Sequence, residues 1–181
     1  MEIVRIFEGR NEEEGLYAVR YEKEGPDEFT RLFLLWDDLA YVRAFCEIHF
    51  DDLQSAFRRQ LSLEECVQEI MDEAAQMEDQ LHDHCNATGL QELFKPLSNY
   101  EYVLHPLQKS KACIRSIVFR RPKIRIYAIR LAPNLFIVTG GAIKLTATMQ
   151  ERSHLKEELS KLERVKTWLK ENELNIPESL N

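Results

Sequence analysis

Residues 124–146 read IRIYAIRLAPNLFIVTGGAIKLT. Two apolar runs flank the turn residues Ala132-Pro133-Asn134, and both runs are rich in β-branched and aromatic side chains, which favour strands. The stretch therefore predicts two antiparallel strands, over residues 124–131 and 135–145. Gly140-Gly141 interrupts the second strand and indicates either a structural bulge or a place where a ligand approaches the backbone.

The residues on either side of this hairpin predict more strands. Upstream, Ile114 to Phe119 is apolar enough for a strand and is joined to the hairpin by the basic turn Arg120-Arg121-Pro122-Lys123, so the three strands form an antiparallel meander. At the N-terminus, residues 2–7 and 16–22 form a second strand pair around an acidic loop.

Helical periodicity fills most of the remaining chain. One helix is predicted around residues 29–36, a second from Leu39 towards Phe57, a third from Ser62, where Ser62 and Glu65 form a capping box, and a last one over 153–172. The sequence therefore predicts an α+β fold in which an antiparallel sheet, built from the N-terminal hairpin and the C-terminal meander, packs against amphipathic helices.

The length of 181 residues suits a single domain. We expect an acidic lobe over 1–90, a basic lobe over 91–172 and a frayed tail over 173–181. No apolar run approaches the roughly 20 residues of a membrane helix and no leader is apparent, so we expect a soluble, cytoplasmic protein that does not associate with membranes. The four cysteines lack a C-x-x-C pair, which predicts buried free thiols.

Charge is distributed very unevenly. Residues 1–94 hold 8 Lys or Arg against 23 Asp or Glu, whereas residues 95–170 hold 16 against 5. A basic segment of this kind attracts polyanions, and nucleic acid is the first candidate. Alternatively, the acidic half neutralises the basic half within one fold.

Residues 93–171 resemble the C-terminal half of the RNA-cleaving toxins of the RelE/HigB superfamily. The resemblance rests on the order of the strand from Ile124 to Arg130, the hairpin, the apolar strand that leads to Lys144, and the amphipathic helix from Ser153. It implies a RelE-like fold, metal-independent cleavage of mRNA, including ribosome-bound mRNA, no cofactor, and a cognate antitoxin as partner. A homodimer is also compatible with it. The chain departs from the superfamily in its acidic N-terminal half.

The resemblance also implies candidate site residues. The catalytic candidates are Arg125, Tyr127, Arg130 and Lys144, and the RNA-binding candidates are Arg121, Lys123, Arg152 and His154. Arginine and lysine suit the phosphate, and tyrosine offers a stacking surface for a base. Strand alternation nevertheless places Arg130 on the face opposite Arg125 unless a bulge intervenes.

Other interpretations stay open at this stage. His154 is also typical of a helix cap or a surface position, and His82, His84 and Cys85 lack the second cluster that a metal site would need. The basic sheet could bind RNA or a protein without cleaving RNA. The acidic helix over residues 62–83 could lie over the basic sheet and restrain it as a polyanion mimic.

Overall fold

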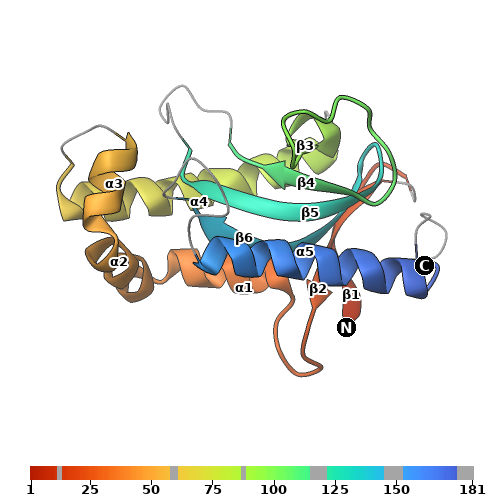
Figure 1. Cartoon of the computed structure of the whole chain (residues 1–181), viewed down its shortest axis with the longest axis horizontal. Helices are drawn as coiled ribbons and strands as arrows, with labels where there is room; N and C mark the ends of the chain where they lie inside the picture. The colour runs from red at the N-terminus through yellow and green to blue at the C-terminus, as the bar shows by residue number, and fades with distance from the viewer. Residues whose placement is uncertain (12–13, 58–60, 87–88, 115–121, 145–152, 175–181) are drawn as a thin grey trace.

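The structure is a computed structural model that describes residues 1–11, 14–57, 61–86, 89–114, 122–144 and 153–174. These residues form an α+β fold, as the sequence predicts, with helices packed on a six-stranded mixed sheet (Figure 1). The strands are β1 (Glu2–Glu8), β2 (Gly15–Arg20), β3 (Phe94–Pro96), β4 (Gln108–Ala112), β5 (Ile124–Ala132) and β6 (Leu135–Ile143). The helices are α1 (Glu28–Asp37), α2 (Leu39–Ile48), α3 (Phe50–Phe57), α4 (Leu63–Asn86) and α5 (Ser153–Glu171), with the short 3-10 turn η1 (Leu90–Glu92).

The strand order is β1-β2-β6-β5-β4-β3. The sequence predicts an antiparallel sheet, but one of the strand pairs is parallel. β2 runs parallel to β6, with Gly15 to Ala18 opposite Leu135 to Val138, while the remaining pairs are antiparallel. A parallel pair needs a long crossover. The whole chain between β2 and β6 supplies that crossover, which no local pattern could reveal.

The partner of β5 also differs from the prediction. β5 pairs with β4 at residues 108–112, whereas Ile114 is described outside any strand and residues 115–119 lie outside the described residues. β4 reads QKSKA and buries Gln108, Ser110 and Ala112 on one face. Its buried side chains are mostly polar, so it lacks the apolar alternation that marks a strand.

Side chains cap the starts of α2 and α4. The carboxylate of Asp38 accepts hydrogen bonds from the backbone N–H groups of Ala40 and Tyr41 at the start of α2. At the start of α4 the Ser62 hydroxyl accepts the Glu65 N–H, and the Glu65 carboxylate accepts the Ser62 N–H, which confirms the capping box. The predicted second helix is divided into α2 and α3 at His49, whose backbone leaves the helical region.

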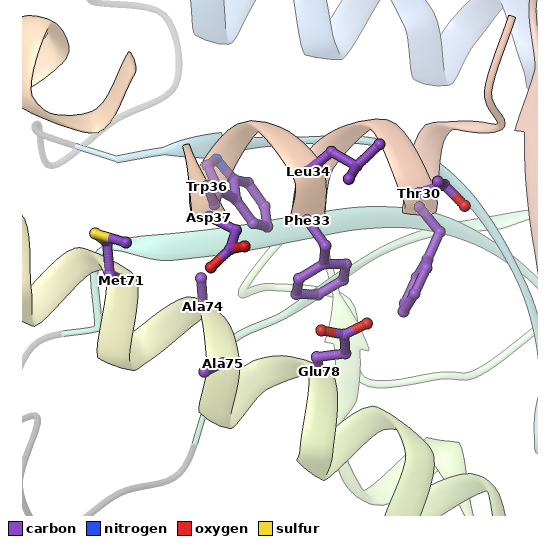
Figure 2. A pocket seen from close by; sticks show the side chains of 10 residues that line it. Thr30, Phe33, Leu34, Trp36, Asp37, Met71, Ala74, Ala75 and Glu78 are labelled. Carbon is purple, nitrogen blue, oxygen red and sulfur yellow. The ribbon is translucent and has the colours of Figure 1, made fainter. Parts of the chain in front are cut away.

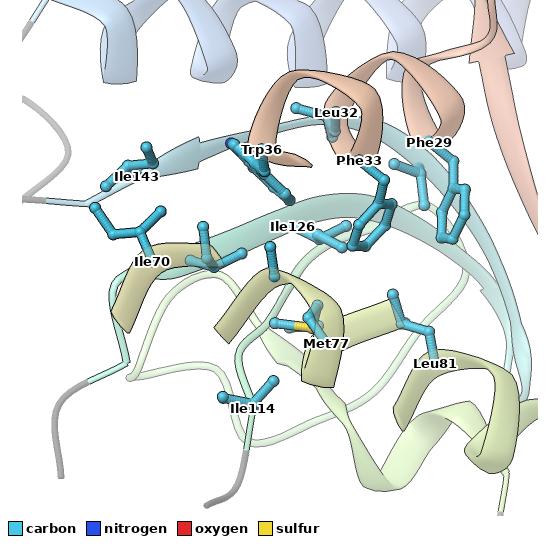
Figure 3. Packing of buried hydrophobic residues seen from close by; sticks show 14 of the residues in the cluster. Phe29, Leu32, Phe33, Trp36, Ile70, Met77, Leu81, Ile114, Ile126 and Ile143 are labelled. Carbon is cyan, nitrogen blue, oxygen red and sulfur yellow. The ribbon is translucent and has the colours of Figure 1, made fainter. Parts of the chain in front are cut away.

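The sheet has an apolar core on each face. α1 and α4 lie side by side over one face (Figure 2), and Figure 3 shows how their apolar residues meet β5 and β6 there. α5 covers the opposite face through Leu162, Val165 and Leu169. Both halves of the sequence thus contribute to one sheet. None of the helices in the described ranges combines the length and the apolarity needed to cross a bilayer.

The Gly140-Gly141 pair lies at a bulge in β6. Tyr127 pairs with Gly140 and Ala128 pairs with Val138, which leaves Thr139 as an extra residue. A Cβ on Gly140 would lie 1.8 Å from the carboxylate of Glu158 in α5, and one on Gly141 would lie 2.8 Å from Leu32 in α1. The two glycines therefore let helices approach both faces of the sheet. Of the two explanations that the sequence offers for this pair, the structure agrees with a structural bulge.

Candidate nucleic-acid interface

Four cations lie on the face of the sheet that α5 partly covers. Lys95 pairs with Lys111 across β3 and β4, and Lys111 pairs with Tyr127, whose ring belongs to the core beneath α5. Side chains two residues apart on a strand share a face, so Lys109 and Arg125 point to the same side. We call Lys95, Lys109, Lys111 and Arg125 the basic face.

The hydrogen bonds of the basic face hold its cations in place. The ammonium of Lys111 donates to the Leu97 carbonyl and to Oδ1 of Asn99, both at 2.8 Å. Burial lowers the pKa of Lys111, and the charge of Arg125 lowers it further. Arg125 donates from Nη1 to its neighbour's carbonyl, on Ile124, at 2.7 Å. Two cations thus lie close enough for the charge of Arg125 to lower the pKa of Lys111, and such an arrangement favours an added anion.

Helix α5 extends the positive charge beyond the sheet. Lys109 forms an ion pair with Glu163 of α5, and its hydrogen bond lowers the pKa of that carboxylate, with Lys166 and Lys170 adding to the effect. Glu163, Lys166 and Lys170 recur at helical spacing and so share one side of α5. The basic face is therefore bordered by further lysines.

A loop with exposed aromatic residues lies beside the basic face. Between β3 and β4, Tyr100 and Tyr102 are 87% and 86% exposed. The base of this loop is fixed, because Leu97 and Leu107 pack in the core beneath α5 and Asn99 accepts from Lys111. Exposed aromatic rings next to a basic groove are typical of proteins that bind single-stranded nucleic acid.

The predicted catalytic residues have very different surroundings. Arg125 and Lys144 are half-buried at the surface, and the Lys144 backbone N–H donates to the Lys123 carbonyl. Tyr127 is 1% exposed, and burial raises the pKa of its hydroxyl. The ring is packed in the core, so it offers no stacking surface to a base in this conformation.

Arg130 points away from the basic face. It pairs with Phe136, which belongs to the core beneath α1 and α4, whereas Ile129 belongs to the core beneath α5. Its guanidinium is buried, donates from Nε to the Ala132 carbonyl at 3.2 Å, and has its pKa lowered by that burial. Arg130 and Arg125 are therefore not placed to bind one phosphate together.

The predicted RNA-binding residues fall into two groups. Lys123 is 3% exposed and its ammonium forms an ion pair with Glu69 of α4, so it holds the helix against β5 and is not presented to solvent. Arg121 and Arg152 lie outside the described residues. His154 is the second residue of α5, but its side chain is not among those described.

Sequence reasoning missed Lys95, Lys109, Lys111 and the loop tyrosines. Two features of the sequence could have indicated them. Lysine alternates with other residues over 108–112, as expected for one face of a strand, and Tyr100 and Tyr102 flank a charged residue, Glu101, in a loop. Within the described ranges no three His, Cys, Asp or Glu side chains are arranged to hold a metal ion. The cysteines are free thiols, with Cys113 alone among the four half-exposed and the others buried.

No protein-family model matches the chain, and searches of curated proteins and of solved structures find no match either. The resemblance to the RelE/HigB superfamily therefore stays a prediction.

Proposed function

We propose that the protein binds single-stranded RNA along the basic face, with bases stacked on Tyr100 and Tyr102. The observation that supports this function is the alignment of four cations on one side of β3, β4 and β5 beside two exposed aromatic rings. Lys109 and Lys111 are about 6.6 Å apart along the strand, a spacing comparable with that of consecutive phosphates in an extended nucleic-acid strand. The choice of RNA over DNA follows from the family resemblance.

The test is binding of a fluorescein-labelled, mixed-sequence RNA, measured by anisotropy at several salt concentrations. We expect Lys109→Ala with Lys111→Ala to weaken binding and to reduce the salt slope by about 0.7 for each phosphate that the variant no longer neutralises. Lys23→Glu is the control for charge, because it lowers the net charge by two as the double variant does, and Lys23 is exposed in the connection between β2 and α1. Equal effects of the control and the double variant would contradict the proposed site.

A second experiment separates stacking from charge. Replacing Tyr100 and Tyr102 by alanine should cost about 1–3 kcal/mol of binding free energy per stacked base, whereas replacing them by phenylalanine should preserve binding. Since both rings are exposed, neither replacement should lower the stability of the fold. If the alanine variants bound RNA with the affinity of the wild type, the loop would not be part of the RNA-binding site.

RNA cleavage of the RelE/HigB type is the second candidate, favoured by the environment of Lys111. A lysine with a lowered pKa can accept the 2′-hydroxyl proton, so that the 2′-oxygen forms a bond to phosphorus while the bond to the 5′-oxygen breaks and the resulting ammonium gives the proton to that leaving oxygen. A neighbouring arginine can stabilise the negative charge that develops on the phosphate. Lys111 and Arg125 would take these two roles. A cognate antitoxin would then be the protein partner that the resemblance implies.

Cleavage is tested with end-labelled RNA in the presence of EDTA, because the proposed reaction uses no metal. We expect products that end in a 2′,3′-cyclic phosphate, and we expect Lys111→Ala and Arg125→Ala to abolish their formation. Induced expression in a bacterial host should arrest growth for the wild type, and Arg125→Ala and Lys144→Ala should relieve the arrest. Intact RNA and harmless expression of the wild type would leave RNA binding as the only function.

A further inference from the structure

A groove of about 350 Å³ runs between α1 and α4, on the side of the sheet opposite the basic face. Figure 2 shows its two walls, with Met71 near Trp36 and Glu78 near Phe33, so the helices run in opposite directions along it. The α1 wall extends from Phe29 to Asp37, which is about two and a half helical turns.

Residue size explains why the two helices leave a hollow. α1 contributes the rings of Phe29, Phe33 and Trp36, whereas α4 contributes Ala74 and Ala75. The three rings and Ala74 are buried, so the floor is closed and apolar, and Ala75 is exposed at the opening. Leu34 stands on the α1 side with 64% of its surface exposed.

The opening of the groove is acidic. Asp37 and Glu78 line it, and neither forms a salt bridge with any residue that the structure describes. Burial raises the pKa of Glu78, and the neighbouring charges of Asp79 and Asp37 raise it further. Since α4 contains no Lys or Arg, Glu78 lacks a cation on its own helix, and Arg31 of α1 is paired with Glu28.

We propose that this groove binds a basic amphipathic helix of a partner protein. A third helix fits the furrow between two packed helices, and its apolar side chains would fill the hollow beside Ala75 and cover Leu34. Lysine or arginine residues flanking that apolar face would reach Asp37 and Glu78. RNA does not suit this groove, because its phosphates would meet carboxylates.

The groove is independent of the RNA-binding proposal. The two surfaces lie on opposite sides of the sheet, so a peptide in the groove and RNA on the basic face should bind at the same time. Failure of one proposal therefore does not imply failure of the other.

The probe is a designed, fluorescently labelled amphipathic peptide of about five helical turns, with leucine on one face and lysine beside it. A peptide of identical composition in scrambled order has the same net charge but no apolar face. We expect the full-length protein to bind the amphipathic peptide at least about tenfold more tightly, since about 1.4 kcal/mol of extra apolar burial gives that ratio. Equal affinity for both peptides would overturn the proposal.

Matched variants test the position of the site. Leu34→Ser should weaken peptide binding about fivefold or more, because the serine buries less apolar surface against the peptide than the leucine does. Leu39→Ser is its control, because Leu39 is 59% exposed but does not line the groove. Both leucines are exposed, so both variants should fold.

The contribution of charge is tested separately. Asp37→Asn with Glu78→Gln should weaken binding more than Glu64→Gln with Asp83→Asn, which changes the net charge equally at exposed α4 positions outside the groove. If both double variants weakened peptide binding equally, the peptide would be attracted to the acidic surface as a whole, and the proposed binding site would be wrong. Self-association of the protein that Leu34→Ser abolishes would also overturn it, in favour of a second copy as the occupant.

Discussion

The carboxylate of Glu73 provides a direct test of what holds α4 on the sheet. Glu73 is fully buried, and it accepts hydrogen bonds from the backbone N–H groups of Lys123 at 2.9 Å and Ile124 at 2.6 Å. These two residues lead into β5, and both are buried. Replacing Glu73 by alanine should therefore leave two buried donors without an acceptor.

The expected destabilisation follows from those two donors. An unsatisfied buried N–H costs about 1–3 kcal/mol, so the two together give about 2–6 kcal/mol. Burial raises the pKa of Glu73 despite the two hydrogen bonds, and removing the carboxylate relieves that cost of desolvation. We therefore expect Glu73→Ala to lower the free energy of unfolding by about 2–4 kcal/mol, a large part of a typical value of about 5–15 kcal/mol. Glu73→Gln should lower it less, because its amide oxygen still accepts one of the two N–H groups.

The assay is urea unfolding at neutral pH, followed by far-ultraviolet circular dichroism. Asp72→Ala is the control, since Asp72 is exposed on the same helix and accepts from Gln68 at the surface. It should change the free energy of unfolding by less than about 0.5 kcal/mol. If Glu73→Ala cost no more than Asp72→Ala, the two buried hydrogen bonds would not be what fixes α4 to β5.

Three further predictions concern the polar groups beneath α5. Gly140→Ala places a Cβ 1.8 Å from the Glu158 carboxylate and should cost about 1–3 kcal/mol in thermal unfolding, whereas Gly25→Ala, with its nearest contact at 3.5 Å, should be nearly neutral. Equal losses of stability in the two variants would show that α5 can move away from Gly140 without a loss of free energy. Tyr127→Phe removes a buried hydroxyl without a hydrogen-bond partner among the described residues, so stability should stay unchanged or rise by up to about 1 kcal/mol, with RNA affinity unaltered. A decrease in stability or in RNA affinity would indicate a role for the hydroxyl. Burial raises the pKa of Glu158, so its contribution to stability is present below the unfolded pKa and is lost as pH rises through the folded value. Glu158→Gln should therefore cost more stability near pH 4 than near pH 8, and the opposite trend in urea unfolding would contradict burial as the main cause.

The sequence by itself determined the elements whose signals are local. The apolar spacing of Phe29, Leu32, Phe33 and Trp36 predicts α1, and the same residues are buried against the sheet. Ser62 and Glu65 predict the start of α4 through groups only three residues apart. These predictions succeed because capping and amphipathic periodicity act within one or two helical turns.

Strand alternation also predicted which candidate side chains could act together. Arg125 and Tyr127 share the face beneath α5, and Arg130 lies on the other. Alternation alone could not show how deeply each side chain is buried. From their residue types we expect three side chains to be exposed to solvent, yet all three are buried in the fold, namely Lys123, Tyr127 and Arg130.

Only the tertiary structure decided which distant residues meet. The parallel pairing of β2 with β6 joins residues more than a hundred positions apart, and the basic face needs β3, β4 and β5 in register before its cations align. The groove between α1 and α4 likewise depends on alanines of one helix meeting aromatic rings of another. Local periodicity specifies the face that each element buries. It leaves open which partner covers that face, because that choice depends on packing across the whole chain.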